Sequence, residues 1–183
     1  ISGFFGKFIG DRNSEVVTSL LVTISAILSA LVLYNVIFNQ YQDNITIATW
    51  ISSGTLNVNW SMKIDSLSAI MLVVVTSISS LVHIYSIGYM SHDPHKPRFM
   101  AYLSLFTFAM LMLVTSDNFI QVFFGWEGVG LCSYFLIGFW FKKKAANTAA
   151  IKAFVVNRVG DFGFALGIFL IFYYFGTVNY DEV

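Results

Sequence analysis

The sequence has one cysteine, Cys132, among 183 residues. A single cysteine cannot form a disulfide within the chain, and it cannot supply the four thiolates that hold a common iron–sulfur cluster. Charged residues are also scarce, at 11%, and the formal net charge is zero. No overall positive field is therefore available to attract nucleic acid. The two prolines both lie between residues 91 and 98, so no proline interrupts a helix elsewhere.

What the chain has instead is long apolar runs, with 57% hydrophobic residues overall. About 20 apolar residues of helix cross the hydrocarbon core of a bilayer. We therefore predict an all-α polytopic membrane protein with one membrane region over residues 1–183 and five transmembrane helices. The predicted helices cover approximately residues 16–38, 66–89, 99–115, 119–141 and 149–175.

The segment at about 41–63 differs from these runs. Its stretch "ITIATWISSGTLNVNW" is rich in Ile, Thr, Val and Trp and has serines and Gly54 at its centre. This pattern predicts a β-hairpin outside the bilayer, with an irregular loop as the alternative. Trp50 and Trp60 suit the membrane interface.

Basic residues gather in alternate loops. They are Lys7 and Arg12, then Lys96 and Arg98, then Lys142, Lys143 and Lys144. With five spans these loops fall on one side of the membrane, and the positive-inside rule makes that side the cytoplasm or the mitochondrial matrix. In the second basic loop, His92, Asp93 and His95 allow metal binding in principle, but the adjacent prolines favour a tight polar turn. We expect no metal site.

Glu127 is the one charged residue of the predicted helix at 119–141. As its ninth residue, it lies about 13 Å into a bilayer core about 30 Å thick. An isolated charge there costs at least about 2.5 kcal/mol. Gly125, Gly128 and Gly130 leave space around it for a helix or for water. The favoured interpretation is proton or ion handling, and the alternative is one half of a static ion pair between helices.

The predicted helix at 149–175 carries Arg158 and Asp161, spaced i and i+3 so that they meet on one face. Asn157 joins that face. We expect Gly160, Gly163 and Gly167 of the same helix to let it pack closely on the Glu127 helix. Asp161 is a functional candidate, whereas Arg158 is equally consistent with an internal pair that only orients the helix.

His83 is the one ionisable side chain between Ser66 and Tyr85 in the predicted helix at 66–89. It is a weaker candidate for a relay, and a hydrogen-bonded packing histidine is the favoured interpretation.

Three segments carry a family resemblance: "GWEGVGLCSYFLIGFW" (125–140), "NRVGDFGFALG" (157–167) and "HIYSIGYMSHDPHKPRFMAYLSLFTF" (83–108). Together they closely resemble subunit 5 of NADH:ubiquinone oxidoreductase, respiratory complex I. The resemblance implies the antiporter-like helical fold and a proton-translocating subunit of the membrane arm. Because the chain begins with Ile1 and ends just after an apolar segment, we expect it to be an N-terminal fragment.

The resemblance also implies roles for matched positions. Glu127 matches the family's essential glutamate, which pairs with a lysine on a later, broken helix in a proton half-channel. Asp161 matches a functionally important aspartate, and Arg158 matches its neighbouring arginine. The partner lysine has no counterpart here.

By the same resemblance, NADH, FMN, iron–sulfur clusters and ubiquinone bind to other subunits, so we expect no cofactor and no redox chemistry on this chain. The implied partners are other complex I subunits, especially the adjacent antiporter-like one, together with the lipid bilayer and no nucleic acid. The implied location is the mitochondrial inner membrane, with the bacterial plasma membrane as the alternative. The two alternative functions are a subunit of a multi-subunit sodium/proton antiporter and a purely structural membrane-arm subunit.

Overall fold

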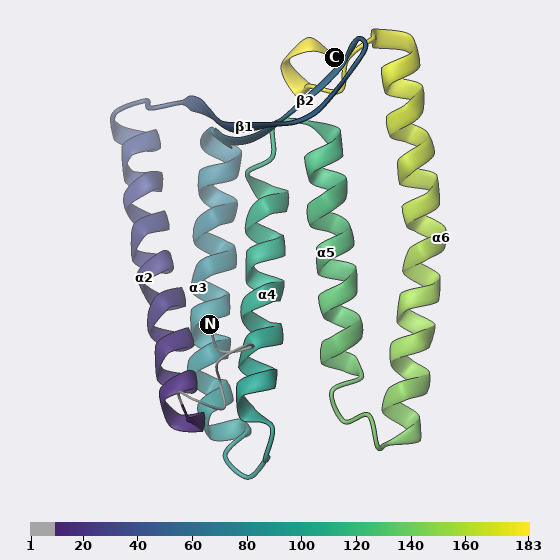
Figure 1. Cartoon of the computed structure of the whole chain (residues 1–183). Coiled ribbons are helices and arrows are strands. Elements are labelled where there is room, and N and C mark those ends of the chain that lie inside the picture. The colour runs from purple at the N-terminus through teal and green to yellow at the C-terminus, as the bar shows by residue number, and fades with distance from the viewer. Residues whose placement is uncertain (1–9) are drawn as a thin grey trace.

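Five long antiparallel helices make up most of the molecule (Figure 1). The computed structural model describes residues 10–183. In chain order the elements are α2 (Asp11–Phe38), β1 (Asp43–Ser53), β2 (Leu56–Ile64), α3 (Ser66–Tyr89), α4 (Lys96–Val114), α5 (Phe119–Ile137), α6 (Lys144–Phe175) and the short 3-10 helix η1 (Tyr180–Glu182). All five long helices have the length and apolar composition to cross a membrane. The predicted fold, five such helices and one hairpin, is confirmed.

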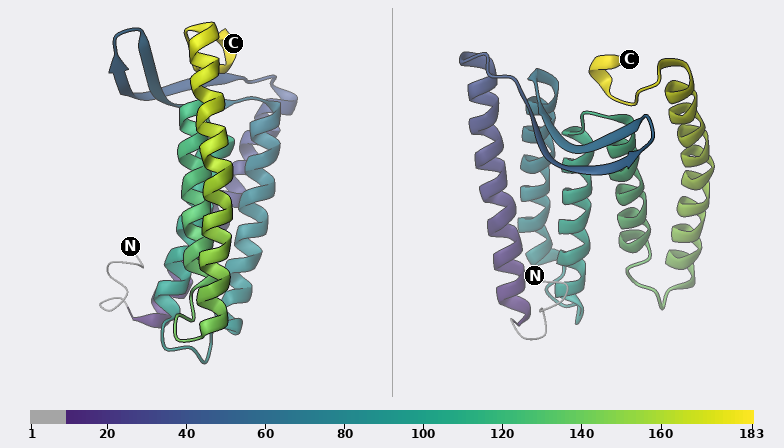
Figure 2. Two further views of the ribbon diagram at one scale, coloured as in Figure 1. Left: turned by 90° about the vertical axis from the view of Figure 1, so that its right-hand side faces the viewer. Right: turned by 45° about the horizontal axis from the view of Figure 1, so that its top comes forward.

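The helices form a curved row in which neighbours in sequence are neighbours in space (Figures 1 and 2). Helices α2, α3 and α4 all contact one another, α5 packs on α4, and α6 packs on α5. Helix α6 is therefore the most loosely held of the five within the described part of the chain.

Helix α3 has its predicted bounds, whereas some ends of the other helices differ from the predicted ones by one to five residues. Helix α2 begins at Asp11, five residues before the apolar run, and α6 begins at Lys144. Helix α5 ends at Ile137 rather than at Phe141, because a tight turn follows it. Hydropathy marks the part of a helix that suits lipid, whereas polar turns of the same helix extend beyond it.

The basic residues lie at one end of the bundle. Arg12 at the start of α2, the α3–α4 loop and the α5–α6 loop are all at the lower end in Figure 1, and the hairpin is at the other. Lys7 lies outside the described residues. In the α3–α4 loop, the Asp93 carboxylate accepts hydrogen bonds from the His95 amide (2.8 Å) and the Trp140 indole (3.0 Å). This loop is thus a polar turn that is tied to the α5–α6 loop.

The hairpin of β1 and β2 lies across the ends of the helices (Figure 2). Its turn contains Gly54 with φ 59°, a left-handed conformation that glycine adopts without strain. Two buried side chains at the start of α5 fix β2. Gln121 donates to the Ser61 carbonyl (2.7 Å) and accepts from the Ser61 amide (3.0 Å), and the Asn118 amide group donates to the Asn59 carbonyl (2.9 Å).

Replacing Gln121 by leucine should loosen the hairpin. The change removes both bonds to Ser61, which is fully buried. Each backbone group left unsatisfied costs about 1–3 kcal/mol. Hydrogen exchange of the β2 amides in the assembled protein should accelerate by about tenfold or more. Ser52→Ala, which removes an exposed hydrogen bond to Asn57 (2.9 Å), should change it little. Equal exchange in both variants would show that Gln121 does not anchor the strand.

Polar contacts between hydroxyl groups join α2 to α3. Ser29 of α2 contacts Thr76 of α3 (2.7 Å), and Thr23 contacts Ser80 (2.8 Å). Large apolar side chains such as Leu28 point outward. This is the inverse of a soluble core and is typical of membrane bundles, where small and polar residues hold helices together.

Candidate functional site

Glu127 lies midway along α5 and faces α6. Its side chain is 22% exposed, and its Oε2 atom forms an ion pair with Nη1 of Arg158 on α6. The depth of Glu127 in the membrane does not by itself decide whether it pairs with Arg158. Each helix must also be rotated so that the two side chains meet. The glutamate therefore has a cationic partner within the described residues, as the ion-pair interpretation required.

Arg158 is shared between two carboxylates. The same Nη1 atom lies 3.6 Å from Oδ2 of Asp161, one turn along α6. The predicted i, i+3 contact is thus confirmed. The outer side of Arg158 is open, since its side chain is 45% exposed, whereas that of Asp161 is 9% exposed. Two carboxylates and one guanidinium give this cluster a formal charge of minus one when both acids are ionised.

Trp126, a residue that sequence reasoning missed, holds the Asp161 carboxylate in place. Its indole Nε1 donates to Oδ1 of Asp161 at 2.8 Å. This bond and the Arg158 contact use different oxygens of Asp161, so the carboxylate is fixed from both sides. The signal was present in the sequence, because a tryptophan in mid-span needs a partner for its N–H. We name Glu127, Arg158, Asp161 and Trp126 the α5–α6 cluster.

Glycines of α5 set the direction in which Glu127 points. A Cβ atom built on Gly125 would lie 2.8 Å from the backbone of Leu113 in α4, and one on Gly128 would lie 3.0 Å from the Ala109 Cβ. These glycines let α5 approach α4 closely, which leaves the Glu127 face for α6. Their role is helix packing on α4, rather than free space around the carboxylate.

The expectation that Gly160, Gly163 and Gly167 pack on the Glu127 helix is wrong. No described heavy atom outside the immediate helix lies within 4 Å of a Cβ built on any of them. At about 100° per residue these glycines lie on the far side of α6 from Asp161. Asn157 does face α5, since its Nδ2 is 3.9 Å from a Cβ built on Gly130.

His83 lies elsewhere, between α3 and α4. It is fully buried, with Nδ1 2.8 Å from the Ser79 carbonyl and Nε2 3.2 Å from the Ser104 hydroxyl. A neutral ring that donates from Nδ1 and accepts at Nε2 satisfies both atoms. The structure does not bring His83 into contact with the α5–α6 cluster, and its bonds are those of a packing histidine.

Another carboxylate, outside the α5–α6 cluster, is buried where sequence reasoning placed only a loop. Glu15 in the second turn of α2 is 4% exposed, and its Oε1 lies 3.8 Å from Nζ of Lys96 at the start of α4. It escaped notice because the apolar run begins one residue later, at Val16. This pair lies at the basic end of the bundle and helps to join α2 to α4.

Known proteins resemble the chain along its whole length. The family described as NADH-Ubiquinone oxidoreductase (complex I), chain 5 N-terminus, matches residues 50–100, and the family described as NADH:quinone oxidoreductase/Mrp antiporter, TM, matches residues 116–183. NADH-ubiquinone oxidoreductase chain 5 of Triticum aestivum is 56% identical over 100% of this chain and 27% of its own length. NADH-quinone oxidoreductase subunit L of Rickettsia bellii is 49% identical over 100% of this chain and 28% of its own length.

The fold is shared more widely. A chain of the Mrp complex from Dietzia sp. superimposes with a TM-score of 0.78 at 20% identity, over 98% of this chain and 18% of that one. At that identity the likeness concerns the fold alone. The chain spans about a quarter of the length of the relatives it matches. On the identity to those relatives and the two family matches, which together take in more than half of its residues, the chain belongs to the family of NADH-ubiquinone oxidoreductase chain 5 and subunit L, the antiporter-like membrane subunits.

Proposed function

We propose that the chain works in a proton-translocating membrane-arm subunit of complex I, and that Glu127, Arg158 and Asp161 handle the proton. The observation that carries the proposal is the sharing of Arg158 between Glu127 and Asp161. A single cation that contacts two acids in mid-membrane can favour the ionised form of one or the other.

The chemistry follows from the position of the guanidinium. A carboxylate that loses its cationic neighbour in a medium of low dielectric binds a proton more tightly. When Arg158 moves from Glu127 toward Asp161, Glu127 takes up a proton, and the return of Arg158 expels it. Trp126 keeps Asp161 in place during this exchange. The Glu127 side chain is 22% exposed, so its carboxylate stays accessible to a further cationic group, such as the lysine that the family resemblance implies.

The rest of the proposal concerns the host complex. Proton movement here is driven by NADH:ubiquinone oxidoreduction on other subunits, which bind the NADH, FMN, iron–sulfur clusters and ubiquinone. The partners are other subunits of that complex, with the adjacent antiporter-like subunit foremost. Relatives occur both in plants and in bacteria, and we favour the mitochondrial inner membrane because the identity to the plant protein is the higher of the two. The sodium/proton antiporter alternative is supported by the family description over residues 116–183, which names NADH:quinone oxidoreductase and the Mrp antiporter together, and by the shared fold.

Replacing Asp161 by asparagine in the intact complex tests the proposal. Asparagine keeps an oxygen for the Trp126 indole, so the complex should assemble normally. With one acid left, Arg158 has no alternative partner, and protons pumped per NADH oxidised should fall clearly below the wild-type ratio.

The matched control is Asp181→Asn, at an exposed carboxylate of η1 that pairs with Lys63 outside the five long helices. It should leave the pumping ratio unchanged. Normal pumping by an assembled Asp161→Asn complex would favour the structural alternative, in which the buried charges only join helices.

A further inference from the structure

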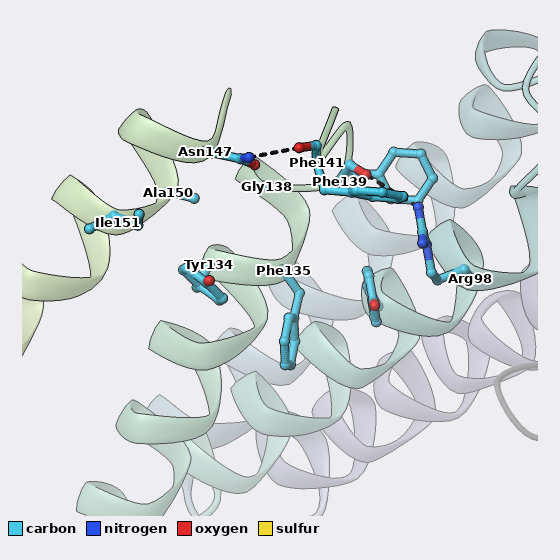
Figure 3. Close-up of a pocket in the computed structure, with 10 residues that line it drawn as sticks. Arg98, Tyr134, Phe135, Gly138, Phe139, Phe141, Asn147, Ala150 and Ile151 are labelled. Atoms are coloured by element: carbon cyan, nitrogen blue, oxygen red, sulfur yellow. Dashed lines mark hydrogen bonds between the residues drawn. The ribbon is translucent and has the colours of Figure 1, made fainter. Parts of the chain in front are cut away.

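A cavity of about 430 Å³ lies between the ends of α4, α5 and α6, at the basic end of the bundle (Figure 3). Its volume is within the range of about 300–1,000 Å³ that small-molecule sites occupy. It is separate from the α5–α6 cluster, none of whose members lines it. The lining residues that matter here are Arg98, Tyr102, Tyr134, Phe135, Phe141 and Ile151.

Arg98 is the charged group of this cavity. Its Nη2 atom donates to the Phe139 carbonyl at 3.2 Å, and the guanidinium lies over the rings of Phe139 (4.7 Å) and Phe141 (5.3 Å). Its Nε atom is buried and has no hydrogen-bond partner. Within residues 10–183, Arg98 forms no salt bridge, and Asp93, the nearby acid, does not line the cavity. Arg98 thus lines the cavity with a guanidinium that has no carboxylate partner among the described residues.

Further positive charge lies next to the cavity in the sequence. Lys142, Lys143 and Lys144 follow directly after Phe141, which lines the cavity. Helix α6 begins beside it and has no side-chain cap at its N-terminus. The first turn of a long helix carries partial positive charge and free N–H groups. Each of these features favours a negatively charged ligand.

The other walls of the cavity are aromatic and aliphatic, as in a lipid-binding site. Figure 3 shows Tyr134 and Phe135 from α5 and Ile151 from α6 around the cavity. Ile151 is 56% exposed, so the cavity edge continues into the apolar outer surface of α6. A soluble anion would gain nothing from these aromatic and aliphatic walls, whereas an acyl chain would.

We propose that this cavity binds the phosphate headgroup of an anionic membrane phospholipid. The phosphate accepts hydrogen bonds from Arg98, whose planar fork of donors matches phosphate oxygens. The acyl chains run past Ile151 along α6 into the bilayer. Basic pockets between membrane helices on the cytoplasmic or matrix side bind such headgroups, because the leaflet on that side contains anionic lipids.

The test uses photoactivatable phosphatidylglycerol incorporated into phosphatidylcholine nanodiscs that contain the intact complex. Crosslinked peptides are mapped by mass spectrometry. Label should appear on the peptides that carry Tyr134 and Ile151. Arg98→Gln should lower that label by about fivefold, the effect of one basic residue near a membrane surface. Ile151→Trp, which fills the cavity edge and keeps all charges, should lower it too. Arg12→Gln, an exposed basic residue at the same end, should not.

Three results would overturn the proposal. Label of equal strength from photoactivatable phosphatidylcholine would remove the preference for anionic lipid. Displacement of the label by inorganic phosphate alone would identify a site for a free anion. Absence of label in the wild-type complex would mean that other protein residues occupy the cavity in the assembly. If Arg98→Gln fails to assemble, Ile151→Trp alone decides between binding and no binding.

Discussion

Glu127→Gln should stop most proton pumping by the intact complex while the complex still assembles. The amide keeps the shape of the side chain but cannot carry a proton in exchange. A positioned acid–base group contributes about 10²–10⁴-fold to proton transfer, so we expect the pumping rate to fall by at least about tenfold. NADH oxidation falls with it if the two processes are tightly coupled.

The Glu127→Gln complex should still assemble, because Arg158 keeps a negatively charged partner. Breaking a buried ion pair costs about 3–5 kcal/mol when the remaining charge is stranded. Here Arg158 keeps Asp161 at 3.6 Å, is 45% exposed, and finds an amide oxygen in place of the Glu127 carboxylate. The measurements are the amount of complex on native gels, the NADH oxidation rate and the proton uptake of reconstituted vesicles.

Glu182→Gln is the matched control, because this carboxylate lies beyond the five long helices and contacts Thr177. It should pump normally. Loss of assembled complex in Glu127→Gln would make the glutamate a structural residue, and full pumping by an assembled variant would exclude it as a proton carrier.

The second large effect is expected from Gly125→Ala, a change of one methyl group. The added Cβ would meet the Leu113 backbone at 2.8 Å, where neither side can yield without moving a helix. Overpacking of this kind costs about 1–3 kcal/mol, and more where backbone must shift. Since α5 carries Glu127 and supports α6, we expect less assembled complex and a lower thermal midpoint for what remains.

Gly88→Ala provides the comparison for this change. Gly88 is also helical, and no heavy atom outside its own turn lies within 4 Å of a Cβ built there. Alanine at such a site is neutral or slightly favourable, because glycine in a helix costs about 0.5–1 kcal/mol relative to alanine. Equal stability of the two variants would show that the α4–α5 contact is looser than the structure has it.

Helix count, hairpin and charge distribution followed from the sequence because each depends on local composition. The Arg158–Asp161 contact followed as well, since both residues lie on one helix and spacing alone brings them together. The Glu127–Arg158 pair did not follow from spacing, because it depends on how two helices are rotated about their axes. The same unknown rotation made the expectation for Gly160 wrong.

Buried polar residues at helix ends were the other omission. Gln121 and Asn118 read as ordinary polar residues near a loop, and only their hydrogen bonds to β2 reveal that they anchor a strand. Glu15 was missed for a similar reason, since hydropathy places the start of the span just after it. Sequence patterns show where apolar surface is needed, whereas these contacts depend on which chain segment lies opposite.

The contact between the hairpin and α6 is a point about which α6 can tilt. At that end, Ile168 of α6 packs with Val58 of β2 and Val178, while the lower part of α6 is held by α5 alone among the described helices. Arg158 lies ten residues from Ile168, about 15 Å at the helical rise. A tilt of α6 by about 4° around the hairpin would therefore move Arg158 by about 1 Å. A rotation that small at the membrane surface is enough to lengthen one of the two ion pairs and shorten the other.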